Sequence, residues 1–384
     1  MKTTALFLMT LAMAAASAAH AQTFKTLYAF KGTTDGGAPW YPPMLYNGLL
    51  YGATYYGGAA PPQVGVIFQL DPTTNFESTY YTFLGQPNDG AYPMSGMVAD
   101  PYGDFFGTTT QGGFSLRGTI YEITGGSEYV VYNFSGRDGE DPEGGLIIDP
   151  LGNIYGATTG GGANGSGTVF ALTAFGTFVQ LYSFGNYNGD GIAPTANLAL
   201  YKNTLYGTTS EGGQRDWGTV FSLSPKTKQE SILYSFNGST NGGTPIGGLV
   251  SDGKGNLYGT ASLGGNNNGN AGNGVIFRLN ISSRTYTVVH TFTGPDGSQP
   301  SGALVTDGKG NLFGTTFAGG ANGYGTVFQI NSKGTFTTLH SFTNGTDGSY
   351  PYGGLTIDST GNLYGTATRG GAYNWGTLFE ITFP

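Results

Sequence analysis

The sequence predicts an all-β fold: a seven-bladed β-propeller with four antiparallel strands per blade, closed by the N-terminal strand. Three observations lead to it. The five-residue motif Leu-Tyr-Gly-Thr-Thr, or a near copy, occurs seven times at a spacing of about 50 residues, from Leu50–Thr54 to Leu363–Ala367. Each repeat contains four segments that suit short strands. A copy of the fourth segment also precedes the first repeat, which indicates how the ring closes.

The third repeat shows the four strands most clearly. Each segment is rich in β-branched and aromatic residues and is bounded by Gly, Pro, Asn or Asp, which is the pattern of a strand between turns. No segment has a sustained apolar period of 3.6 residues, so helices should be nearly absent. Four strands in a repeat of about 50 residues are typical of a propeller blade. The segments are Gly145–Asp149, Asn153–Thr158, Gly167–Leu172 and Thr177–Phe184.

The connections between the strands are also regular. A tight hairpin is predicted between the first and second strands, at Asp149–Asn153 and its copies, because Asp can bond the backbone that follows it and Gly supplies a positive φ. A Gly-Gly loop, such as Gly161-Gly162, separates the second and third strands. Before each first strand stands Asp-Gly or Asn-Gly, and a proline follows four residues after the acid or amide, as in Asp190 and Pro194.

The two ends of the chain predict how the ring closes. Thr23–Phe30 resembles the fourth-strand segment Thr177–Phe184, and the chain ends with a third strand, Gly376–Thr382. The last blade therefore lacks an outer strand, while the first segment is a spare one. We predict that Thr23–Phe30 pairs beside Gly376–Thr382 and so removes the open sheet edges.

Composition and charge exclude several classes of protein. The chain has 384 residues, of which only 10% are charged, and its net charge is −8. It has no cluster of Lys and Arg, so nucleic acid is not an expected partner. It has no cysteine, which excludes disulfides and thiolate metal sites. Seven even repeats favour a single domain over residues 22–384, and we expect a monomer.

The first 21 residues predict a secretory signal peptide. Lys2 is followed by the apolar run Ala5–Ala19 and by Ala19-His20-Ala21, an Ala-x-Ala cleavage site. The run is too short and too rich in Ala for a good membrane span, although a buried helix is an alternative. No second hydrophobic segment follows. We expect a protein without a membrane span that is secreted or periplasmic after cleavage near Ala21.

The repeated Leu-Tyr-Gly-Thr-Thr motif resembles that of the GloVer tandem-repeat proteins, a family of exported bacterial proteins. The resemblance covers nearly all of the mature chain. More loosely, the motif Gly-Leu-x-x-Asp-x-x-Gly-Asn is similar to that of NHL blades, and the Gly-Gly pair after the second strand is similar to that of kelch blades. These resemblances imply a propeller and no particular reaction. The C-terminal sorting tail of the anchored members is missing, so they do not imply a surface anchor.

Antiparallel strands place all Asp-Gly loops and all Gly-Gly loops on one face of the predicted propeller. Carboxylates and aromatic rings on that face suit a carbohydrate, or a ligand bridged by a cation such as Ca²⁺, which prefers oxygen ligands. In the alternative, the aspartates only form turns and the tryptophans pack between blades. The candidate ligand-binding residues are Asp35, Asp89, Asp138, Asp190, Asp296, Asp347, Trp40, Trp217 and Trp375, with Tyr324 beside them.

Catalytic motifs are nearly absent from the sequence. It has no His-Glu-x-x-His, Gly-x-Ser-x-Gly or Gly-Lys-Ser/Thr motif. His290 and His340 occupy a position held by Tyr in sibling strands, so we interpret them as structural. An enzyme would have to use carboxylates or Tyr, and the charged clusters that break the repeat pattern are the candidates. They are Glu140-Asp141 and Glu211 with Arg215-Asp216.

The favoured function is therefore a non-catalytic exported module that binds a carbohydrate or another surface protein, or serves as a scaffold, through the face that carries the Asp and Gly residues. No cofactor is expected, apart from a weak indication of Ca²⁺. An alternative is an extracellular polysaccharide-active hydrolase or lyase with carboxylates at the channel mouth. A structural envelope or matrix protein with no small ligand is the third hypothesis.

Overall fold

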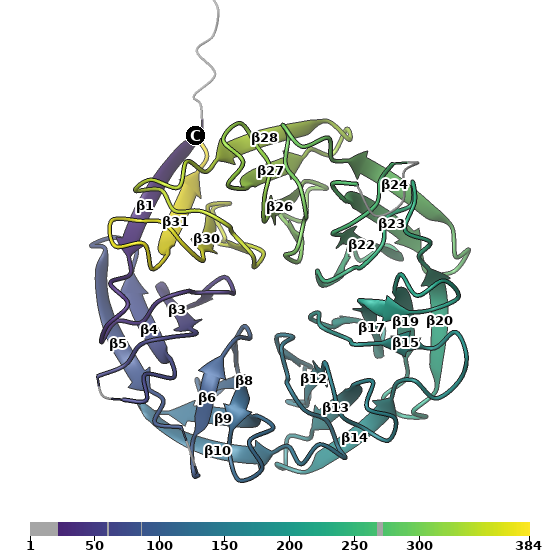
Figure 1. Cartoon of the computed structure of the whole chain (residues 1–384), viewed down its shortest axis with the longest axis horizontal. Coiled ribbons are helices and arrows are strands. Elements are labelled where there is room, and N and C mark those ends of the chain that lie inside the picture. Colours follow the sequence, from purple (N-terminus) through teal and green to yellow (C-terminus); the bar gives the residue numbers. More distant parts are fainter. Residues whose placement is uncertain (1–21, 60, 86, 267–271) are drawn as a thin grey trace, which may run out of the picture.

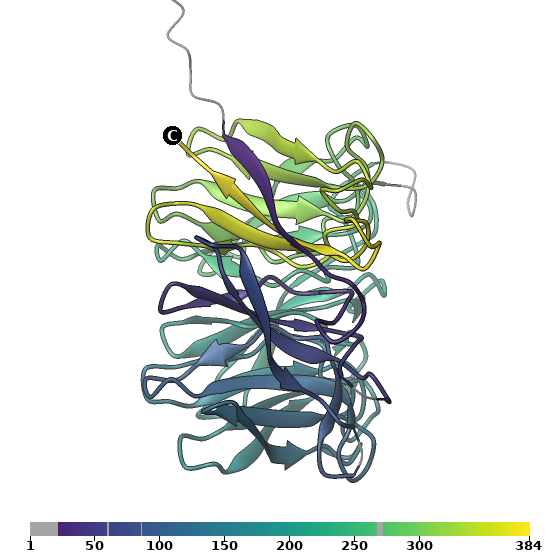
Figure 2. The same ribbon diagram turned by 90° about the vertical axis from the view of Figure 1, so that its left-hand side faces the viewer.

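A computed structural model describes residues 22–384 except 60, 86 and 267–271. The described chain is all-β and forms seven blades around a central axis, as predicted (Figure 1). Seen edge-on, the blades make a disc with loops on both sides (Figure 2). The predicted signal peptide, residues 1–21, lies outside the described residues.

In blades 1 to 6 the strands pair in chain order from the inside outward, while blade 7 takes its outer strand from the N-terminus. Blade 1 contains β2 (Met44–Tyr46), β3 (Leu49–Thr54), β4 (Val66–Asp71) and β5 (Phe76–Thr82). Blade 2 contains β7 (Val98–Ala99), β8 (Phe105–Gly112), β9 (Thr119–Thr124) and β10 (Ser127–Asn133), with β6 (Gly90–Pro93) beside β8. Blade 3 contains β11 (Ile147–Ile148), β12 (Ile154–Thr158), β13 (Thr168–Leu172) and β14 (Phe178–Ser183). Blade 4 contains β16 (Ala199–Tyr201), β17 (Thr204–Thr209), β19 (Thr219–Leu223) and β20 (Glu230–Ser235), with the short pair β15 (Gly191–Ile192) and β18 (Glu211–Gly212).

The remaining three blades follow the same plan. Blade 5 contains β21 (Val250–Ser251), β22 (Asn256–Ala261), β23 (Val275–Asn280) and β24 (Tyr286–Thr291). Blade 6 contains β25 (Val305–Thr306), β26 (Leu312–Thr316), β27 (Thr326–Ile330) and β28 (Phe336–Ser341). Blade 7 contains β29 (Thr356–Ile357), β30 (Leu363–Ala367), β31 (Thr377–Thr382) and, as its outer strand, β1 (Thr23–Ala29).

The antiparallel order gives the disc two different faces. The hairpins between first and second strands and between third and fourth strands lie on one side, which we call the hairpin face. The Gly-Gly loops and the Asp-Gly connections between blades lie on the other side, which we call the glycine face. The predicted Asp turn is present on the hairpin face: in blade 3, Asp149 Oδ1 accepts bonds from the backbone N–H of Leu151 at 2.8 Å and Asn153 at 2.9 Å.

The innermost strands are shorter than the sequence predicts. The segment Gly145–Asp149 contributes only β11, Ile147–Ile148, to the ladder. The reason is that the preceding backbone turns to the neighbouring blade: the N–H of Gly145 donates to Asn197 Oδ1 at 2.6 Å. This hydrogen bond satisfies a backbone donor that the blade's own ladder would otherwise take.

The N-terminal strand closes the ring, as predicted. β1 pairs antiparallel with β31, from Thr23 opposite Thr382 to Ala29 opposite Thr377, and the two lie side by side in Figures 1 and 2. Leu27 and Phe30 at its end are buried. The closing strand therefore supplies core side chains as well as ladder hydrogen bonds.

A second set of hydrogen bonds joins each blade to the one before it. The residue that precedes the repeated proline has a positive φ in every blade, for example 54° at Ala38. This conformation turns its N–H toward the preceding blade, and Ala38 donates to the carbonyl of Trp375 at 2.8 Å. The seven residues are Ala38, Tyr92, Asp141, Ala193, Thr244, Gln299 and Tyr350. Since non-glycine residues with positive φ are uncommon, the repeated geometry indicates that these contacts between blades hold the ring together.

The central glycine of the Leu-Tyr-Gly-Thr-Thr motif has a packing role. In blade 4, Gly207 lies opposite Phe221 in the ladder, and Phe221 is fully buried. A Cβ atom on Gly207 would lie 2.5 Å from the Phe221 ring and 2.8 Å from Leu198. The motif therefore keeps glycine because an aromatic ring of the next strand covers it.

Outer strands of neighbouring blades meet through one repeated position. In four of the seven interfaces an aromatic ring stacks on the Tyr or His of the preceding blade, as Phe178 does on Tyr132 with centroids 3.7 Å apart. The other stacks join Phe24 to His340, Tyr286 to Tyr234, and Phe336 to His290. In the remaining three interfaces the position is Glu77, Glu128 or Glu230. One carboxyl oxygen of each is buried and has no hydrogen-bond partner within the described chain.

These three glutamates predict a pH-dependent stability. Burial raises the pKa of Glu77 and of Glu230 to about 7, and that of Glu128 to about 8. These folded-state pKa values exceed the usual carboxyl pKa of 4.5. The three glutamates therefore contribute their full stability below that pH. The contribution falls as the pH rises further and is lost once the pH has passed through about 7 to 8. We expect the melting temperature of the wild type to fall over this range, and that of a Glu77→Gln, Glu128→Gln, Glu230→Gln variant to fall less.

Thermal melts at several pH values measure this difference. Glu211→Gln, at an exposed position on the glycine face, is the control. Parallel curves for the wild type and the triple variant would show that the three carboxyls do not titrate in this range.

Candidate functional site

Each of the six candidate aspartates bonds to the Tyr or His of the outer strand that precedes it in the chain. Asp190 is typical: its carboxylate accepts bonds from the Tyr182 hydroxyl at 3.0 Å and from the backbone N–H of Asn186 at 2.9 Å and Gly191 at 2.7 Å. Its side chain is buried, with 3% of the residue exposed. A bulge at Leu181 in the outer strand shifts the register just before Tyr182. The aspartate therefore fixes the link from one blade to the next.

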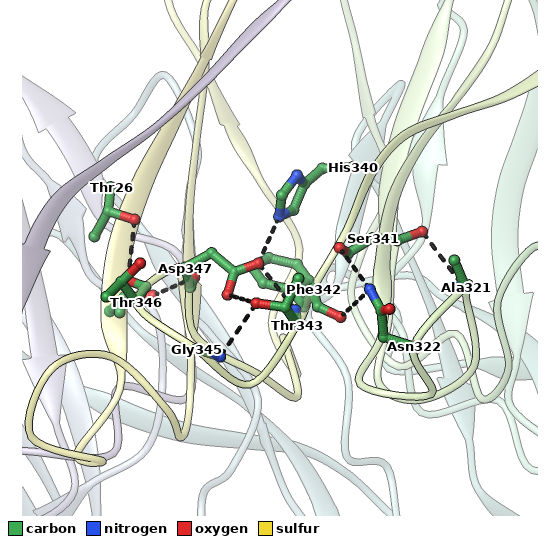
Figure 3. A network of polar contacts seen from close by, with 11 residues as sticks. Thr26, Ala321, Asn322, His340, Ser341, Phe342, Thr343, Gly345, Thr346 and Asp347 are labelled. Atoms are coloured by element: carbon green, nitrogen blue, oxygen red, sulfur yellow. Dashed lines mark hydrogen bonds and ion pairs between the residues drawn. The ribbon is translucent and has the colours of Figure 1, made fainter.

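Figure 3 shows the same arrangement in blade 6, where histidine replaces tyrosine. His340 Nε2 lies 3.0 Å from Asp347 Oδ2, and the Thr343 backbone N–H donates to the same oxygen at 2.9 Å. The Thr343 hydroxyl bonds to Oδ1. Burial lowers the pKa of His340, which the carboxylate beside it opposes. His290 contacts Asp296 in the same way, so both histidines take the position of the tyrosines in sibling strands.

The structure keeps these aspartates apart. Each lies in a different connection between blades, and none of them lines the central cavity. The described part of the chain contains no group of three or more His, Asp or Glu side chains that could hold a metal ion. The role of Asp35, Asp89, Asp138, Asp190, Asp296 and Asp347 in ligand binding stays a prediction. A ligand would have to compete with the hydrogen bonds that they already make.

The three candidate tryptophans occupy two kinds of place. Trp217 and Trp375 cover glycines at the junction with the next blade: a Cβ atom on Gly238 or Gly32 would lie 2.3 Å from their rings. Trp375 remains 41% exposed. Trp40 instead stands at the central channel, where its ring meets Tyr352 edge-on with centroids 4.9 Å apart.

The charged clusters that break the repeat pattern lie in loops of the glycine face. Glu140 forms an ion pair with Arg117 across the junction of blades 2 and 3. Asp216 Oδ1 accepts a bond from the backbone N–H of Gly212 at 2.9 Å, while Glu211 is exposed. The structure thus gives Glu140 and Asp216 local partners and does not pair them with each other.

A central cavity follows the axis of the propeller. It has a volume of about 710 Å³, and the inner segments of all seven blades contribute to its lining. The lining is mostly glycine backbone and aliphatic side chains, such as Leu146, Leu249 and Leu304. Its polar and aromatic groups include Tyr41 and Tyr352 toward the glycine face.

The residue after the repeated proline stands just before the innermost strand of each blade, and three residues at this position, Ile246, Ser301 and Tyr352, line the channel. The residue at this position differs from blade to blade, as does the residue before the proline, and Glu143 is its one carboxylic acid. The seven residues are Trp40, Met94, Glu143, Thr195, Ile246, Ser301 and Tyr352. We call Trp40, Tyr41, Glu143 and Tyr352 the channel mouth.

Electrostatic interactions connect the members of the channel mouth. Burial raises the pKa of Glu143, which the hydroxyl of Thr159 opposes and the charge of Asp141 reinforces. Burial raises the pKa of Tyr352 to about 12, and the charge of Glu143 adds to that effect. The pKa of Tyr41 is raised for the same reasons, with a further contribution from Tyr352. The carboxyl of Glu143 therefore faces a poorly solvated, aromatic surrounding.

Two buried polar atoms at the repeat position that follows the proline have no hydrogen-bond partner within the described chain. They are the indole Nε1 of Trp40 and the hydroxyl of Thr195. Buried polar groups in folded proteins are normally satisfied, so each of these groups needs an explanation, and a polar atom of a ligand or a water molecule is one. The signal that could have identified this site in the sequence is the variable position within an otherwise regular repeat.

Fold and sequence together define the class of protein: a tandem-repeat seven-bladed β-propeller with a polar and aromatic mouth on one face. The chain belongs to the Gloeobacter/Verrucomicrobia repeat family, whose profile matches residues 15–149, 125–269 and 266–384. The family resemblance seen in the Leu-Tyr-Gly-Thr-Thr motif is thereby confirmed. Among curated proteins, none matches the sequence significantly.

Several solved structures have a similar fold. A streptogramin B lyase matches with a TM-score of 0.62 and 15% identity, over 94% of this chain and 98% of the other. The oligogalacturonate lyase of Vibrio parahaemolyticus matches with a TM-score of 0.57 and 10% identity, over 95% and 97%. The extracellular domain of a two-component system protein of B. thetaiotaomicron matches with a TM-score of 0.59 and 11% identity, over 93% and 39%. At these identities the likeness shows the propeller fold alone.

Within the residues that the structure covers, no helix is long and apolar enough to span a membrane.

Proposed function

We propose that this protein is an exported, non-catalytic binding module that takes a saccharide at the channel mouth on the glycine face. The observation that carries the proposal is the unpartnered indole Nε1 of Trp40 beside the ring of Tyr352, with the half-buried carboxyl of Glu143 close enough to raise the pKa of Tyr41 and Tyr352. The signal peptide expected from the sequence supports a secreted or periplasmic location.

The chemistry of the channel mouth suits a sugar. Aromatic rings give the apolar face of a sugar ring a large surface to contact. Hydroxyl groups of a sugar can donate to Glu143 and accept from the indole N–H, and each such bond removes the cost of an unsatisfied buried group. A cavity with mostly apolar walls and a few polar groups is the usual form of a small-molecule site.

A thermal-shift and calorimetry screen against neutral oligosaccharides, with and without Ca²⁺, tests this proposal. A ligand that binds only the native state raises its melting temperature. We expect Glu143→Gln and Trp40→Phe each to weaken binding about tenfold, since a buried hydrogen bond to a ligand is worth about 1–3 kcal/mol. Glu211→Gln and Tyr373→Phe, at exposed positions, serve as controls.

The outcomes separate the candidate surfaces. Binding that survives both channel-mouth changes but is lost in Asp138→Asn would place the ligand at the aspartate turns and contradict the proposal. Loss of binding with a chelator alone would assign the role to Ca²⁺. No binding to any saccharide in the panel would favour a scaffold without a small ligand.

A polysaccharide-active enzyme is the second candidate. The raised pKa of Glu143 favours it, because burial that favours the protonated carboxyl also favours a role as general acid. Two of the structures with a similar fold are lyases, and one of them is an oligogalacturonate lyase. The propeller fold can therefore carry lyase activity. Release of reducing ends or of unsaturated products from a bound oligosaccharide, lost in Glu143→Gln, would identify an enzyme.

A further inference from the structure

The hairpin face carries a strong charge asymmetry that the repeat pattern does not require. The hairpins of blades 4 to 6 contain seven cations and two carboxylates, a net charge of +5, although the whole chain has a net charge of −8. The cations are Lys202, Lys226, Lys228, Lys254, Arg284, Lys309 and Lys333, and all seven are exposed. They form two arcs: Lys202, Lys254 and Lys309 on the inner hairpins, and the others on the outer hairpins.

The same face is acidic on the opposite half. The corresponding hairpins of blades 1 to 3 contain no cation, and their carboxylates are Asp71, Asp100, Asp104 and Asp149. They also present exposed apolar side chains: Tyr102 is 90%, Leu151 79% and Phe175 97% exposed. One face therefore has a basic half and an acidic half.

The cations on the basic half are exposed, although Lys228 Nζ donates to the carbonyl of Gln180 at 3.0 Å and Lys202 Nζ lies over the ring of Tyr201. None forms an ion pair with a carboxylate within the described chain, where Arg117 is the one Lys or Arg in such a pair. The two carboxylates among them, Asp252 and Asp307, are used by their turns. Asp252 Oδ1 accepts from the N–H of Lys254 at 2.8 Å and of Asn256 at 3.0 Å, and Asp307 repeats this pattern.

A groove opens between blades 5 and 6 within this basic half. Its volume is about 440 Å³. Lys254, Tyr258 and the turn carboxylate of Asp252 contribute to its lining, together with the small polar side chains of Ser251, Thr306 and Ser332. Lys309 lies between two lining residues of one hairpin, and Lys333 follows Ser332 in another.

Tyr258 distinguishes this groove from the equivalent positions in other blades. Its counterparts Tyr155 and Tyr364 donate their hydroxyls to the turn aspartate of their own blade, at 3.0 and 3.3 Å. Tyr258 makes no such bond to Asp252 in the structure, and it is half-buried where the counterparts are buried. Its ring lies in the wall of the groove, and its phenol can bond a ligand.

We propose that this basic groove binds an acidic polysaccharide, with one uronate residue in the groove and its neighbours along the arc of cations. Lys254, Lys309 and Lys333 would attract the carboxylates. Tyr258 would contact the face of the sugar ring, and the hydroxyls of Ser251, Thr306 and Ser332 would bond its hydroxyl groups. Cations on three successive blades match a chain of regularly spaced carboxylates better than a single anion.

The acidic half argues against an anionic membrane as the partner. Flat docking of the hairpin face on an anionic bilayer would press Asp71, Asp100, Asp104 and Asp149 against like charge. A polymer strand can follow blades 4 to 6 alone and avoid them. This site lies on the face opposite the channel mouth, so it does not depend on the function proposed above.

Calorimetry with defined oligogalacturonates at low salt, using the full chain, tests the proposal. We expect binding that weakens as salt is added, because exposed charge pairs are screened. Lys254→Glu combined with Lys309→Glu should weaken it at least tenfold, and Tyr258→Ala at least threefold. Arg369→Glu is the control: it changes the net charge by two units, as each of the two lysine changes does, at an exposed position on the glycine face, and it should alter binding less than twofold. Melting curves check that the variants fold. We expect them to fold, because Lys254 and Lys309 are exposed residues of hairpins.

Each alternative result would overturn the proposal. An equal loss in Arg369→Glu would indicate a response to total charge alone. Binding to neutral oligosaccharides of the same length with equal affinity would remove the role of the carboxylates. Binding to phosphatidylglycerol vesicles in the absence of oligogalacturonate binding would identify a membrane surface. No binding to the oligomers at low salt would leave the lysines as solubilising charge.

Discussion

A chain that lacks residues 22–31 is expected not to form a stable propeller. The deletion removes β1, the outer strand of blade 7, and with it the buried side chains of Leu27 and Phe30. Truncation of a buried Leu or Phe costs about 2–5 kcal/mol. The two together, with the lost ladder, approach the whole stability of a typical domain, which is about 5–15 kcal/mol. The free edge of β31 would also invite aggregation.

Size-exclusion chromatography and a thermal melt of the truncated chain measure this effect. The informative control is a circular permutant that carries residues 22–31 after Pro384 through a short Gly-containing turn. Thr23 lies opposite Thr382, so this turn would recreate the hairpin between third and fourth strands found in the other blades. The permutant should fold. A truncated chain that stays monomeric with an unchanged melting temperature would contradict the closing role of β1.

Gly207→Ala is expected to destabilise the propeller by about 3 kcal/mol, at the upper end of the usual cost of overpacking a core. The new Cβ atom would lie 2.5 Å from Phe221 and 2.8 Å from Leu198. Neither neighbour can move into solvent, because Phe221 is fully buried and Leu198 is 3% exposed. Denaturant unfolding of the variant measures the loss of free energy.

Two further variants separate crowding from other effects of the substitution. In Gly96→Ala the Cβ atom would lie 3.6 Å from Tyr41, an ordinary contact, so its free energy of unfolding should change little. Adding Phe221→Leu to Gly207→Ala should cost less than the sum of the two single changes, because the smaller side chain makes room. Strictly additive losses would show that the contact with Phe221 is not the cause.

Most of the architecture could be predicted from the sequence because the interactions that define a blade are local. Asp149 and Gly152 specify a hairpin within five residues, and the Leu-Tyr-Gly-Thr-Thr motif repeats the same packing seven times. The length of the innermost strands was not predictable in this way. The backbone N–H of Gly145 donates to the side chain of Asn197 in the neighbouring blade. No feature of either segment alone predicts that contact.

The candidate aspartates show the limit of reasoning from one repeat. The regular Asp-Gly pattern predicts that these carboxylates lie on one face, and the structure adds that the outer-strand bulge at Leu181 and its equivalents places a Tyr or His beside each acid. The repeated aspartates therefore have a hydrogen-bond partner within the fold, and this partner is repeated with them. Glu143 occurs once, at a variable position two residues after Asp141, and no feature of the repeat pattern predicts its burial.

The sequence by itself determined the all-β class, the seven blades, the turns and the closing strand, because each of these depends on residues within one repeat or on the identity of its two ends. Tertiary structure alone decided which residues meet across the ring. Glu143 reaches Tyr41 and Tyr352, which are distant in the chain, and the hairpins of blades 4 to 6 gather scattered lysines on one side. Closure of the ring creates both arrangements, since it sets the distance between positions that no single repeat contains.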